Sequence, residues 1–568
     1  MRPVRKSYLL KTAGGLLGIL QAANVQAITE NQNSIKPNII LIYCDDLDFD
    51  EVSFYNNRNF PSYSGMREAG LFKPDKDDKG LSHFQNRIFL PEGEMAYYND
   101  SRMYMPAVDN LTSNGAVFNR FYVTSAISTP SRYGMITGRH ASKSEGVLTA
   151  LEPGNVMFNS PIRPEEGTFA KEMKRCGYNT GFLGKWHNGI SQAGGKAPAD
   201  LINQDPEDPE TKKYYQGIYN RSVAYLKENM GFDFVDRIYT NNKEQLPVPG
   251  SMRVHNLEWI TEGALNFIRQ DRSNPFFLYM AITLPHGRYT ADWFKENPLA
   301  TPAGMLKERP KGMPTREFIM NTLKEKGIDQ RNATATLIDY SIAAIMNALK
   351  EEGLDKNTVL IFTSDHQSRG KNTCYEVCRV PMFIWWADKI KPGTKIDEIC
   401  ANIDITSTIV DMAGGTVSKD NPQDGMSFLP WLLGKEKKDF RKALLLECGF
   451  SRAAVTKNYK YLVNRPPASI EKKMNDEAEK CLADNSRRRI GWDGFENPHT
   501  GEPGIWFYAD RDFPNFFDRD QIYNLQNDHF EQNNLMNTAE GKKILPEMQN
   551  IMKDLLKDMS YKFGEFKQ

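Results

Sequence analysis

The chain has 568 residues with 72 basic and 72 acidic side chains, so its formal net charge at pH 7 is zero. This balance, without any outstanding basic stripe, argues against a nucleic-acid binder and against a protein that charge holds to a membrane surface. Hydrophobic residues make up 40% of the chain, which is enough for a large core, and the length predicts more than one domain.

Residues 1–27 have the pattern of a secretory signal peptide. Basic side chains within residues 2–6 precede a mostly apolar run over 8–20, and residues 25–27 resemble a small-residue cleavage site. No cysteine follows the apolar run closely, and no later stretch has some eighteen unbroken apolar residues, the length that a membrane span needs. We therefore expect a periplasmic or secreted protein without a lipid anchor or a membrane span.

Seven cysteines are spread widely along the chain, and an odd number argues against a dense disulfide framework. Cys374 and Cys378 are close enough in sequence to pair. Two buried thiols are the simpler interpretation, and we favour it. No spacing of Cys and His fits a structural zinc site.

Residues 38–44 form a short apolar run that predicts a buried strand, and Asp45 and Asp46 follow it directly. Two adjacent carboxylates at a strand end repel each other unless a cation or strong hydrogen-bond donors neutralise them. A hard divalent cation with oxygen ligands is the natural partner. An acidic, solvated turn is the alternative interpretation of this pair.

Residues 128–138 read as a helix with a defined start and end. Ser128 could be its N-cap, Pro130 lies in the first turn, and Gly138 would end it. The start of a helix also offers unpaired N–H groups that suit a bound oxyanion, and Arg132 would strengthen that field. The stretch alone therefore predicts either a capped structural helix or an anion site.

Three further predicted strands also end in charged or imidazole side chains. Each group alone could be a solvated loop or a structural histidine. The carboxyl ends of strands in a doubly wound sheet meet at one edge, so we expect these groups to converge with the first pair in an active site. The convergent groups are Asp45 and Asp46, Lys185 and His187, His286, and Asp365 and His366.

Strands and helices alternate until about residue 440, and short antiparallel strands follow. We expect an α/β fold over residues 28–440, with a large mixed, mostly parallel sheet flanked by helices, and a smaller antiparallel α+β subdomain over 441–568. Residues 52–105, 190–253 and 464–520 read as polar, loop-rich segments on the surface.

Residues 128–138 also resemble the signature of the type I, formylglycine-dependent sulfatases of the alkaline phosphatase superfamily, which is Cys/Ser-x-Pro-Ser/x-Arg followed by Thr-Gly. The resemblance covers nearly the whole mature chain, in the family's order. It implies an alkaline-phosphatase-like fold and hydrolysis of a sulfate ester on a sulfated carbohydrate. The other blocks that resemble the family are 38–46, 106–118, 177–187, 275–286, 358–366, 370–381, and 522–525 with 534–535.

By this resemblance, Ser128 is oxidised to formylglycine, whose hydrated form is the nucleophile. One hydroxyl of the gem-diol would attack sulfur, and deprotonation of the other would expel sulfate. The resemblance also implies a divalent cation, Ca²⁺ or alternatively Mg²⁺. Its implied ligands are Asp45, Asp46, Asp365, His366 and the modified Ser128.

The resemblance implies roles for five further residues. Two cationic side chains orient the gem-diol and offset developing charge. One imidazole is the base for sulfate elimination, another is the acid for the departing alkoxide, and a lysine clamps the sulfate. In that order, these residues are Arg132 and Lys185, His187, His286, and Lys371.

The chain departs from the family's pattern at three points. Most of the family has Cys at the position of Ser128, and serine-type members resemble bacterial enzymes that a radical-SAM maturase modifies. Gly usually follows the Asp-His pair, whereas this chain has Gln367. The span from there to Lys371 is also short.

Two alternatives stay open at this point. One is a phosphoester or phosphonate hydrolase on the same scaffold, for which a second set of Asp/His metal ligands would be expected, and none stands out. The other is a non-catalytic glycan-binding relative in which Ser128 is never modified. The intact set of active-site groups argues against this second alternative.

Overall fold

The structure is a computed structural model that describes most of the chain, and the account below covers the described residues only. They are 36–56, 87–89, 95–97, 103–189, 196–286, 294–328, 330–367, 373, 378–484, 490–494, 513–528 and 531–568. The expected signal peptide, Cys374 and Lys371 lie outside the described residues.

The centre of the molecule is a large mixed sheet, which has eight strands in the described part of the chain. Five neighbouring strands, from β11 to β7, run parallel, and the β12 pairings with β11 and β4 are antiparallel. The predicted mostly parallel sheet is thus confirmed. In spatial order, its strands are β13 (Thr394–Ile396), β4 (Ala116–Phe118), β12 (Met382–Trp386), β11 (Thr358–Ser364), β1 (Asn38–Asp45), β8 (Phe276–Pro285), β6 (Asn179–Lys185) and β7 (Phe234–Tyr239).

The central strand β1 is buried on both faces, because helices cover both sides of the sheet. Ile39, Leu41 and Tyr43 pack into one hydrophobic core, while Ile40 and Ile42 pack into the other. Alternate side chains of a strand point to opposite faces, so an uninterrupted apolar run is what a doubly covered strand requires. The flanking helices thereby hold β1 in the middle of the sheet.

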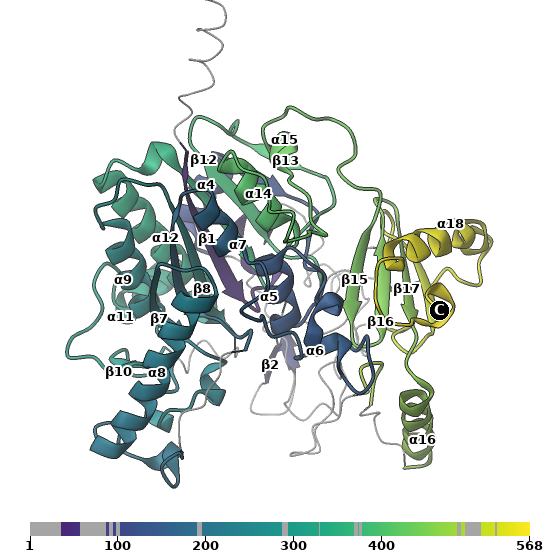
Figure 1. The fold of residues 1–568 in the computed structure, drawn as a ribbon, viewed down its shortest axis with the longest axis horizontal. Helices are drawn as coiled ribbons and strands as arrows, with labels where there is room; N and C mark the ends of the chain where they lie inside the picture. The colour runs from purple at the N-terminus through teal and green to yellow at the C-terminus, as the bar shows by residue number, and fades with distance from the viewer. Residues whose placement is uncertain are drawn as a thin grey trace, which may run out of the picture.

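Figure 1 shows the two helical layers on either side of this sheet. One core is built with α5 (Ser128–Thr137), α7 (Phe169–Arg175) and α14 (Asp404–Met412). The other is built with α4 (Pro106–Ser113), α9 (Leu257–Ile268), α11 (Arg316–Glu325) and α12 (Ala333–Glu351).

A small antiparallel sheet follows the large one and lies to its right in Figure 1. Leu445 and Tyr461 on one face pack against α18 (Ala539–Leu556), whereas Leu446 and Leu462 on the other face join the core of the large sheet. The small sheet is therefore packed onto the large one, as the antiparallel subdomain prediction required. Its strands are β15 (Leu444–Cys448), β16 (Ser451–Val455), β17 (Tyr459–Asn464) and β18 (Asp520–Asn524).

The described part of the chain also contains several shorter strands and helices, and six of these strands pair into small two-stranded sheets. These shorter elements are β2 (Arg87–Phe89), β3 (Met95–Tyr97), β5 (Phe121–Tyr122), β9 (Ala300–Thr301), β10 (Gly304–Met305), β14 (Cys400–Ala401), α2 (Ser53–Asn56), α6 (Glu145–Leu148) and α15 (Leu429–Leu432).

Two segments that were predicted to be loop-rich contain long helices instead. Within 190–253 lie α8 (Pro209–Asn229) and β7, and within 464–520 lies α16 (Ala468–Asp484). Both helices bury few side chains, so their apolar stripe is too narrow to stand out from the sequence. Tertiary contact along one side is enough to stabilise them.

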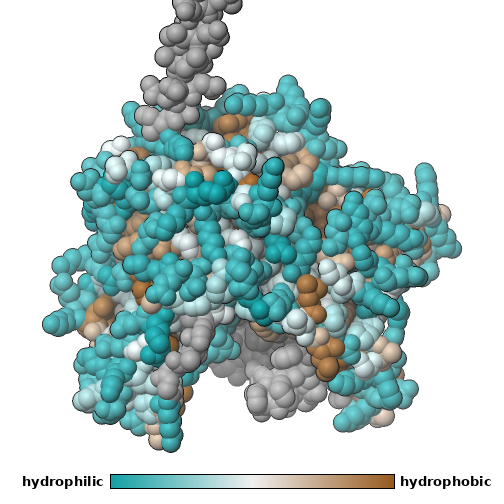
Figure 2. Space-filling view, viewed as in Figure 1, coloured by the Kyte–Doolittle hydropathy of each residue, from teal (hydrophilic) through white to brown (hydrophobic). Residues whose placement is uncertain are grey.

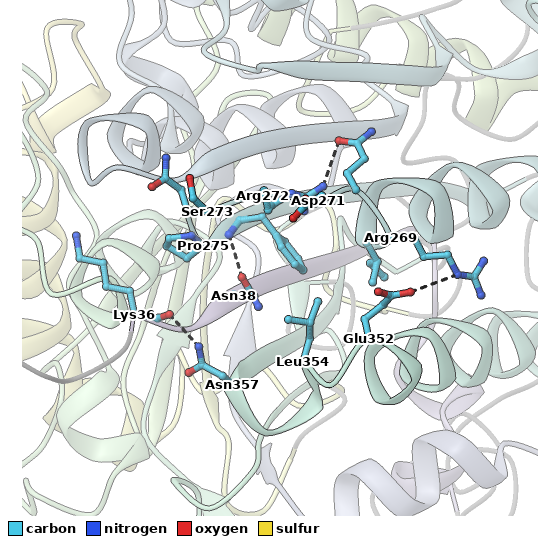
Figure 3. A pocket seen from close by; sticks show the side chains of 14 residues that line it. Lys36, Asn38, Arg269, Asp271, Arg272, Ser273, Pro275, Glu352, Leu354 and Asn357 are labelled. Carbon is cyan, nitrogen blue, oxygen red and sulfur yellow. Dashed lines mark hydrogen bonds and ion pairs between the residues drawn. The ribbon is translucent and has the colours of Figure 1, made fainter.

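The visible face of the molecule in Figure 2 is mostly hydrophilic, with apolar side chains in small, separate patches. Among the described residues, no helix is both long and apolar enough to cross a membrane. A cavity of about 590 Å³ is lined by Lys36, Asn38 and Phe276, among other residues (Figure 3). These residues lie at the beginning of β1 and β8, so this cavity is at the sheet edge opposite the carboxyl ends.

Gly184 in β6 allows the close approach of β8 just before Lys185. Its φ is +93°, and a Cβ there would lie 1.8 Å from the Ala281 carbonyl oxygen. Gly184→Ala is therefore expected to lower the free energy of unfolding by about 3 kcal/mol or more. Urea unfolding would measure the loss.

The matched control is Gly177→Ala, because Gly177 has a similar φ of +86° but no atom within 4 Å of the added Cβ. This variant should lose only about 1 kcal/mol, from backbone strain alone. Equal losses in the two variants would contradict a steric role for Gly184.

Candidate active site

The polar groups predicted at the strand ends meet at one edge of the large sheet. β11, β1, β8 and β6 are parallel neighbours, so their carboxyl ends lie side by side. The first turn of α5, which begins at Ser128, lies against the same edge, where its side chains contact these strand ends. Ile127 is the N-cap of α5, so Ser128 is the first residue of the helix and not the cap that the sequence suggested.

Arg132 connects the strand ends of β1, β11 and β6. Its Nη2 donates to Asp365 Oδ2 at 2.9 Å and to Asp45 Oδ1 at 3.1 Å, and its Nη1 donates to the Lys185 carbonyl oxygen at 3.3 Å. Lys185 Nζ in turn donates to Asp45 Oδ2 at 2.6 Å. Arg132 and Lys185 are fully buried, so this cluster has little screening by water.

The cationic side chains of Arg132 and Lys185 favour the ionised form of the buried carboxyl groups of Asp45 and Asp365. Burial alone would raise the pKa of Asp365, but the surrounding cationic side chains, Arg132 first among them, together outweigh it, and the pKa lies well below its ordinary value. Burial likewise acts to raise the pKa of Asp45, and Lys185 and Arg132 together lower it. Both carboxyl groups are therefore ionised at neutral pH.

Asp46, Asp365 and His366 form a group that could hold a metal ion. One ligand atom from each lies within 4.8 Å of the other two, and all three residues are buried. Ligands of Ca²⁺ lie about 2.3–2.6 Å from the ion, so opposite ligands can be about 5 Å apart. Ser128 Oγ lies 3.0 Å from His366 Nε2, at the border of this group.

The hydrogen bonds of His366 fit a metal ligand. His366 Nδ1 lies 2.8 Å from the Gln367 carbonyl oxygen, which can only accept, so this nitrogen carries a proton. His366 Nε2 lies 3.0 Å from Asp46 Oδ1. A lone pair and a carboxylate oxygen at this distance repel each other unless a cation or a second proton lies between them. The donor set of oxygen and imidazole nitrogen thus suits a divalent cation.

Asp45 differs from the other predicted ligands, because both of its oxygens face cationic side chains. It lies beside the metal-compatible group and not among its members. Its role as a ligand stays a prediction. Asp46 has a φ of 65° and His187 a φ of 63°, both in the left-handed region that non-glycine residues seldom adopt. Such backbone strain concentrates at functional sites.

His187 and His286 lie at the ends of β6 and β8, as predicted. Burial, and then the charges of Lys185 and Arg132, hold the pKa of His187 well below its ordinary value, so its imidazole is neutral and can accept a proton. Its Nδ1 has no hydrogen-bond partner among the described residues. His286 Nε2 lies 3.9 Å from Asp46 Oδ2, and its side chain is 20% exposed, so it can reach a bound molecule.

Several residues that the sequence did not single out hold the first turn of α5. Asn188 donates to the Thr129 carbonyl oxygen at 2.8 Å, and Asn402 donates to the Ser131 carbonyl oxygen at 2.9 Å. Ser131 Oγ donates to the Asp365 carbonyl oxygen at 2.5 Å. Asn188 follows β6 closely, which is the same signal that identified the other groups, whereas Asn402 follows a strand of only two residues.

His255 was also missed, although it lies close to the site. Its Nδ1 lies 2.9 Å from Thr283 Oγ1 on β8, and its carbonyl oxygen accepts a hydrogen bond from Arg316. Burial first, and then the charges of Lys243 and His286, hold the pKa of His255 well below its ordinary value. Nothing in the local sequence before α9 distinguishes this histidine.

Comparison with known proteins agrees with this architecture. The Sulfatase family model matches residues 89–415, which is more than half of the chain. An N-acetylgalactosamine-6-O-sulfatase of Bacteroides thetaiotaomicron is 24% identical over 82% of this chain and 90% of its own length. An ulvan-active sulfatase of Formosa agariphila is 24% identical over 84% of this chain and 80% of its own length.

Solved structures share the fold at low sequence identity. A sulfatase from work on glycosaminoglycan metabolism by Bacteroides thetaiotaomicron has a TM-score of 0.55 and 20% identity, and covers 92% of this chain and 99% of its own. A protein solved with its substrate D-glucosamine-2-N,6-O-disulfate has a TM-score of 0.52 and 17% identity, and covers 92% of this chain and 98% of its own.

The large, mostly parallel sheet with helices on both faces places the chain in the α/β class. Within that class, the chain belongs to the sulfatase family. It is therefore a sulfuric ester hydrolase, and the predicted enzyme class is confirmed.

Proposed function

We propose that the protein is an exported sulfatase that removes a sulfate group from a sulfated carbohydrate, using formylglycine made from Ser128 and one bound divalent cation, Ca²⁺. The observation that carries this proposal is the position of Ser128 Oγ, 3.0 Å from His366 in the group formed with Asp46 and Asp365. The residue that the signature marks for oxidation thus borders the group that fits a cation.

The carbohydrate substrate is supported by the names of the relatives. One is named for N-acetylgalactosamine-6-O-sulfate, another for ulvan, and one structural neighbour was solved with a glucosamine disulfate. Export is supported by the signal-peptide pattern of residues 1–27, which predicts a periplasmic or secreted enzyme.

The side chains of the site would have two kinds of role, the stabilisation of negative charge and the transfer of protons. Formylglycine, once formed and hydrated, supplies a hydroxyl nucleophile and a second hydroxyl whose deprotonation releases sulfate, and the cation supplies positive charge at that centre. Arg132 and Lys185 hold buried positive charge beside Asp45, which would offset the charge that develops on sulfate oxygens.

The two histidines suit opposite proton transfers. His187 is neutral at physiological pH, because burial and nearby cations lower its pKa, so it can take the proton in the elimination step. His286 is more exposed and lies near Asp46, so it can donate a proton to a departing alkoxide oxygen. Lys371 would clamp the sulfate, by the resemblance alone.

The phosphoester alternative is less well supported. The family of the chain is Sulfatase. A sulfate monoester carries one negative charge and a phosphate monoester two, so a single cation matches sulfate better. The non-catalytic alternative requires that Ser128 stays unmodified, which mass spectrometry of the Ser128 peptide can detect.

Co-expression with a serine-competent radical-SAM maturase tests the proposal. The peptide that contains Ser128 should lose the mass of one hydrogen molecule, and sulfate should be released from sulfated mono- or disaccharides. Mass spectrometry and ion chromatography are the measurements. The control is Ser128→Ala expressed with the same maturase, which should show neither change. Full activity of chains in which Ser128 is unmodified would overturn the mechanism.

A further inference from the structure

The side chain of Gln367 connects two loops of the active site. Phe49 N–H donates to Gln367 Oε1 at 3.0 Å, and Gln367 Nε2 donates to the Arg379 carbonyl oxygen at 2.5 Å. Gln367 is fully buried. The family that the chain resembles usually has Gly at this position, which has no side chain that could make either bond. Both bonds are therefore features of this chain.

The loop after β1 is fastened to the end of β11 by three backbone N–H groups. Asp46 N–H donates to Asp365 Oδ1 at 3.0 Å, Leu47 N–H to Ser364 Oγ at 3.0 Å, and Phe49 N–H to Gln367 Oε1 at 3.0 Å. Side chains of β11 and its following loop accept all three bonds. Gln367 makes the last of them and so fixes the far end of the loop that carries Asp46.

The other end of the Gln367 amide closes a ring of contacts. The Arg379 guanidinium carbon lies 3.9 Å from the centre of the Phe49 ring. The two residues that hydrogen-bond to the Gln367 amide therefore also pack on each other. The backbone of Gln367 adds one more constraint, because its carbonyl oxygen lies 2.8 Å from His366 Nδ1. Gln367 thus contacts both the loop that carries Asp46 and the ring of His366.

We propose that Gln367 is a positioning residue that sets the distance between Asp46 on one loop and Asp365 and His366 on the other. The proposal rests on the cation site of the proposed function. Residues that orient metal ligands through hydrogen bonds typically contribute about 10- to 100-fold to metal affinity. Without the amide, the loop after β1 would lose the hydrogen bond at Phe49, and the distance between Asp46 and the other two metal ligands would be less sharply defined.

The test is the affinity for Ca²⁺ of the full mature chain, with CaCl₂ as the probe, measured by calorimetry. Gln367→Met keeps the length of the side chain and removes both hydrogen bonds. Its dissociation constant for Ca²⁺ should rise by about 10- to 100-fold. Its melting temperature in the presence of a chelator should fall much less than that of a variant in which a large core side chain is replaced by alanine.

The matched control is Asn38→Leu at the opposite edge of the same sheet (Figure 3). Asn38 is also a buried amide, which accepts from Phe276 N–H at 3.0 Å and donates to Thr358 Oγ1 at 3.5 Å, so it joins β1 to β8 and β11. Its loss should lower the melting temperature and leave the Ca²⁺ affinity unchanged. A merely structural role of Gln367 would make the two variants alike.

The outcomes separate this inference from the function on which it rests. If the unsubstituted chain binds no Ca²⁺, the proposed cation site is wrong and the inference falls with it. If that chain binds Ca²⁺ and Gln367→Met binds it equally well, the inference alone is overturned. Should Gln367→Met fail to fold, Gln367→Ala leaves room for water at the two backbone groups, and unchanged affinity in that variant overturns the inference.

Discussion

Arg132→Leu should reduce sulfatase kcat/KM by at least about 10³-fold, because it removes a fully buried charge from the proposed sulfate site. It should also lower the free energy of unfolding by about 3–5 kcal/mol, which is typical when one partner of a buried ion pair is removed. The physical reason is that Arg132 pairs with both Asp45 and Asp365. Without it, Asp365 loses its main counter-charge.

The loss of stability should depend on pH in a defined direction. Burial acts to raise the pKa of Asp365, and the surrounding cationic side chains, of which Arg132 contributes most, together outweigh it, so the native pKa lies below the unfolded value of about 3.9. The carboxylate therefore stabilises the native state above about pH 4, and this contribution is lost as pH falls through the native pKa. In the variant, burial dominates and the pKa of Asp365 rises, so the destabilisation should be larger at neutral pH than near pH 4.

Urea unfolding at the two pH values measures this dependence, and steady-state kinetics measure the activity. Arg132→Lys is the control, since it keeps one positive charge but cannot span two carboxylates with a planar fork. It should fall between the unsubstituted chain and Arg132→Leu in both measurements. A stability difference that does not change with pH would show that the pairing of Arg132 with the carboxylates is not what stabilises the fold.

The strand ends of the site could be predicted because each central strand has a strong local signature. β1, β8 and β11 each contain an apolar run, and a carboxylate or imidazole lies at the carboxyl end of the strand or directly after it. A parallel arrangement then places these groups together without any knowledge of side-chain packing. This is why Asp45, Asp365 and His286 were found from the sequence.

Other parts of the fold had no comparable signature. In α8, Tyr215, Ile218 and Leu226 are buried at helical spacing, but the helix is polar on average, so its sequence reads as a loop. Asn402 follows β14, a strand of only two residues, which is too short for a periodic pattern. The position of His255 depends on Thr283 and Arg316, which are distant in the sequence. Such residues become visible only when the tertiary contacts are known.

Gln367 illustrates a different limit of sequence reasoning. The residue was recognised as a departure from the family's pattern, but the sequence alone gave the substitution no function. Its partners are the backbone groups of Phe49 and Arg379, which carry no residue-specific signal. A side chain that acts through backbone groups of other segments can be interpreted only from the structure.

His286→Ala should affect substrates according to how well their leaving group departs. With a sugar sulfate, the alkoxide leaves poorly without a proton, and loss of a general acid should reduce kcat/KM by about 10²- to 10⁴-fold. With an aryl sulfate that has a stable phenolate leaving group, the loss should be about 10-fold or less. The partial exposure of His286, beside Asp46, suits a proton donor that meets the leaving group.

Kinetics on a paired sugar sulfate and nitrophenyl sulfate measure this difference in one variant. His187→Ala is the matched control, because the elimination of sulfate from the modified residue is the same step whichever alcohol has already departed. When that step limits turnover, His187→Ala should lower kcat for both substrates to a common value. His286→Ala should instead separate the two substrates, and equal losses on both would remove His286 as the general acid and leave it a binding role.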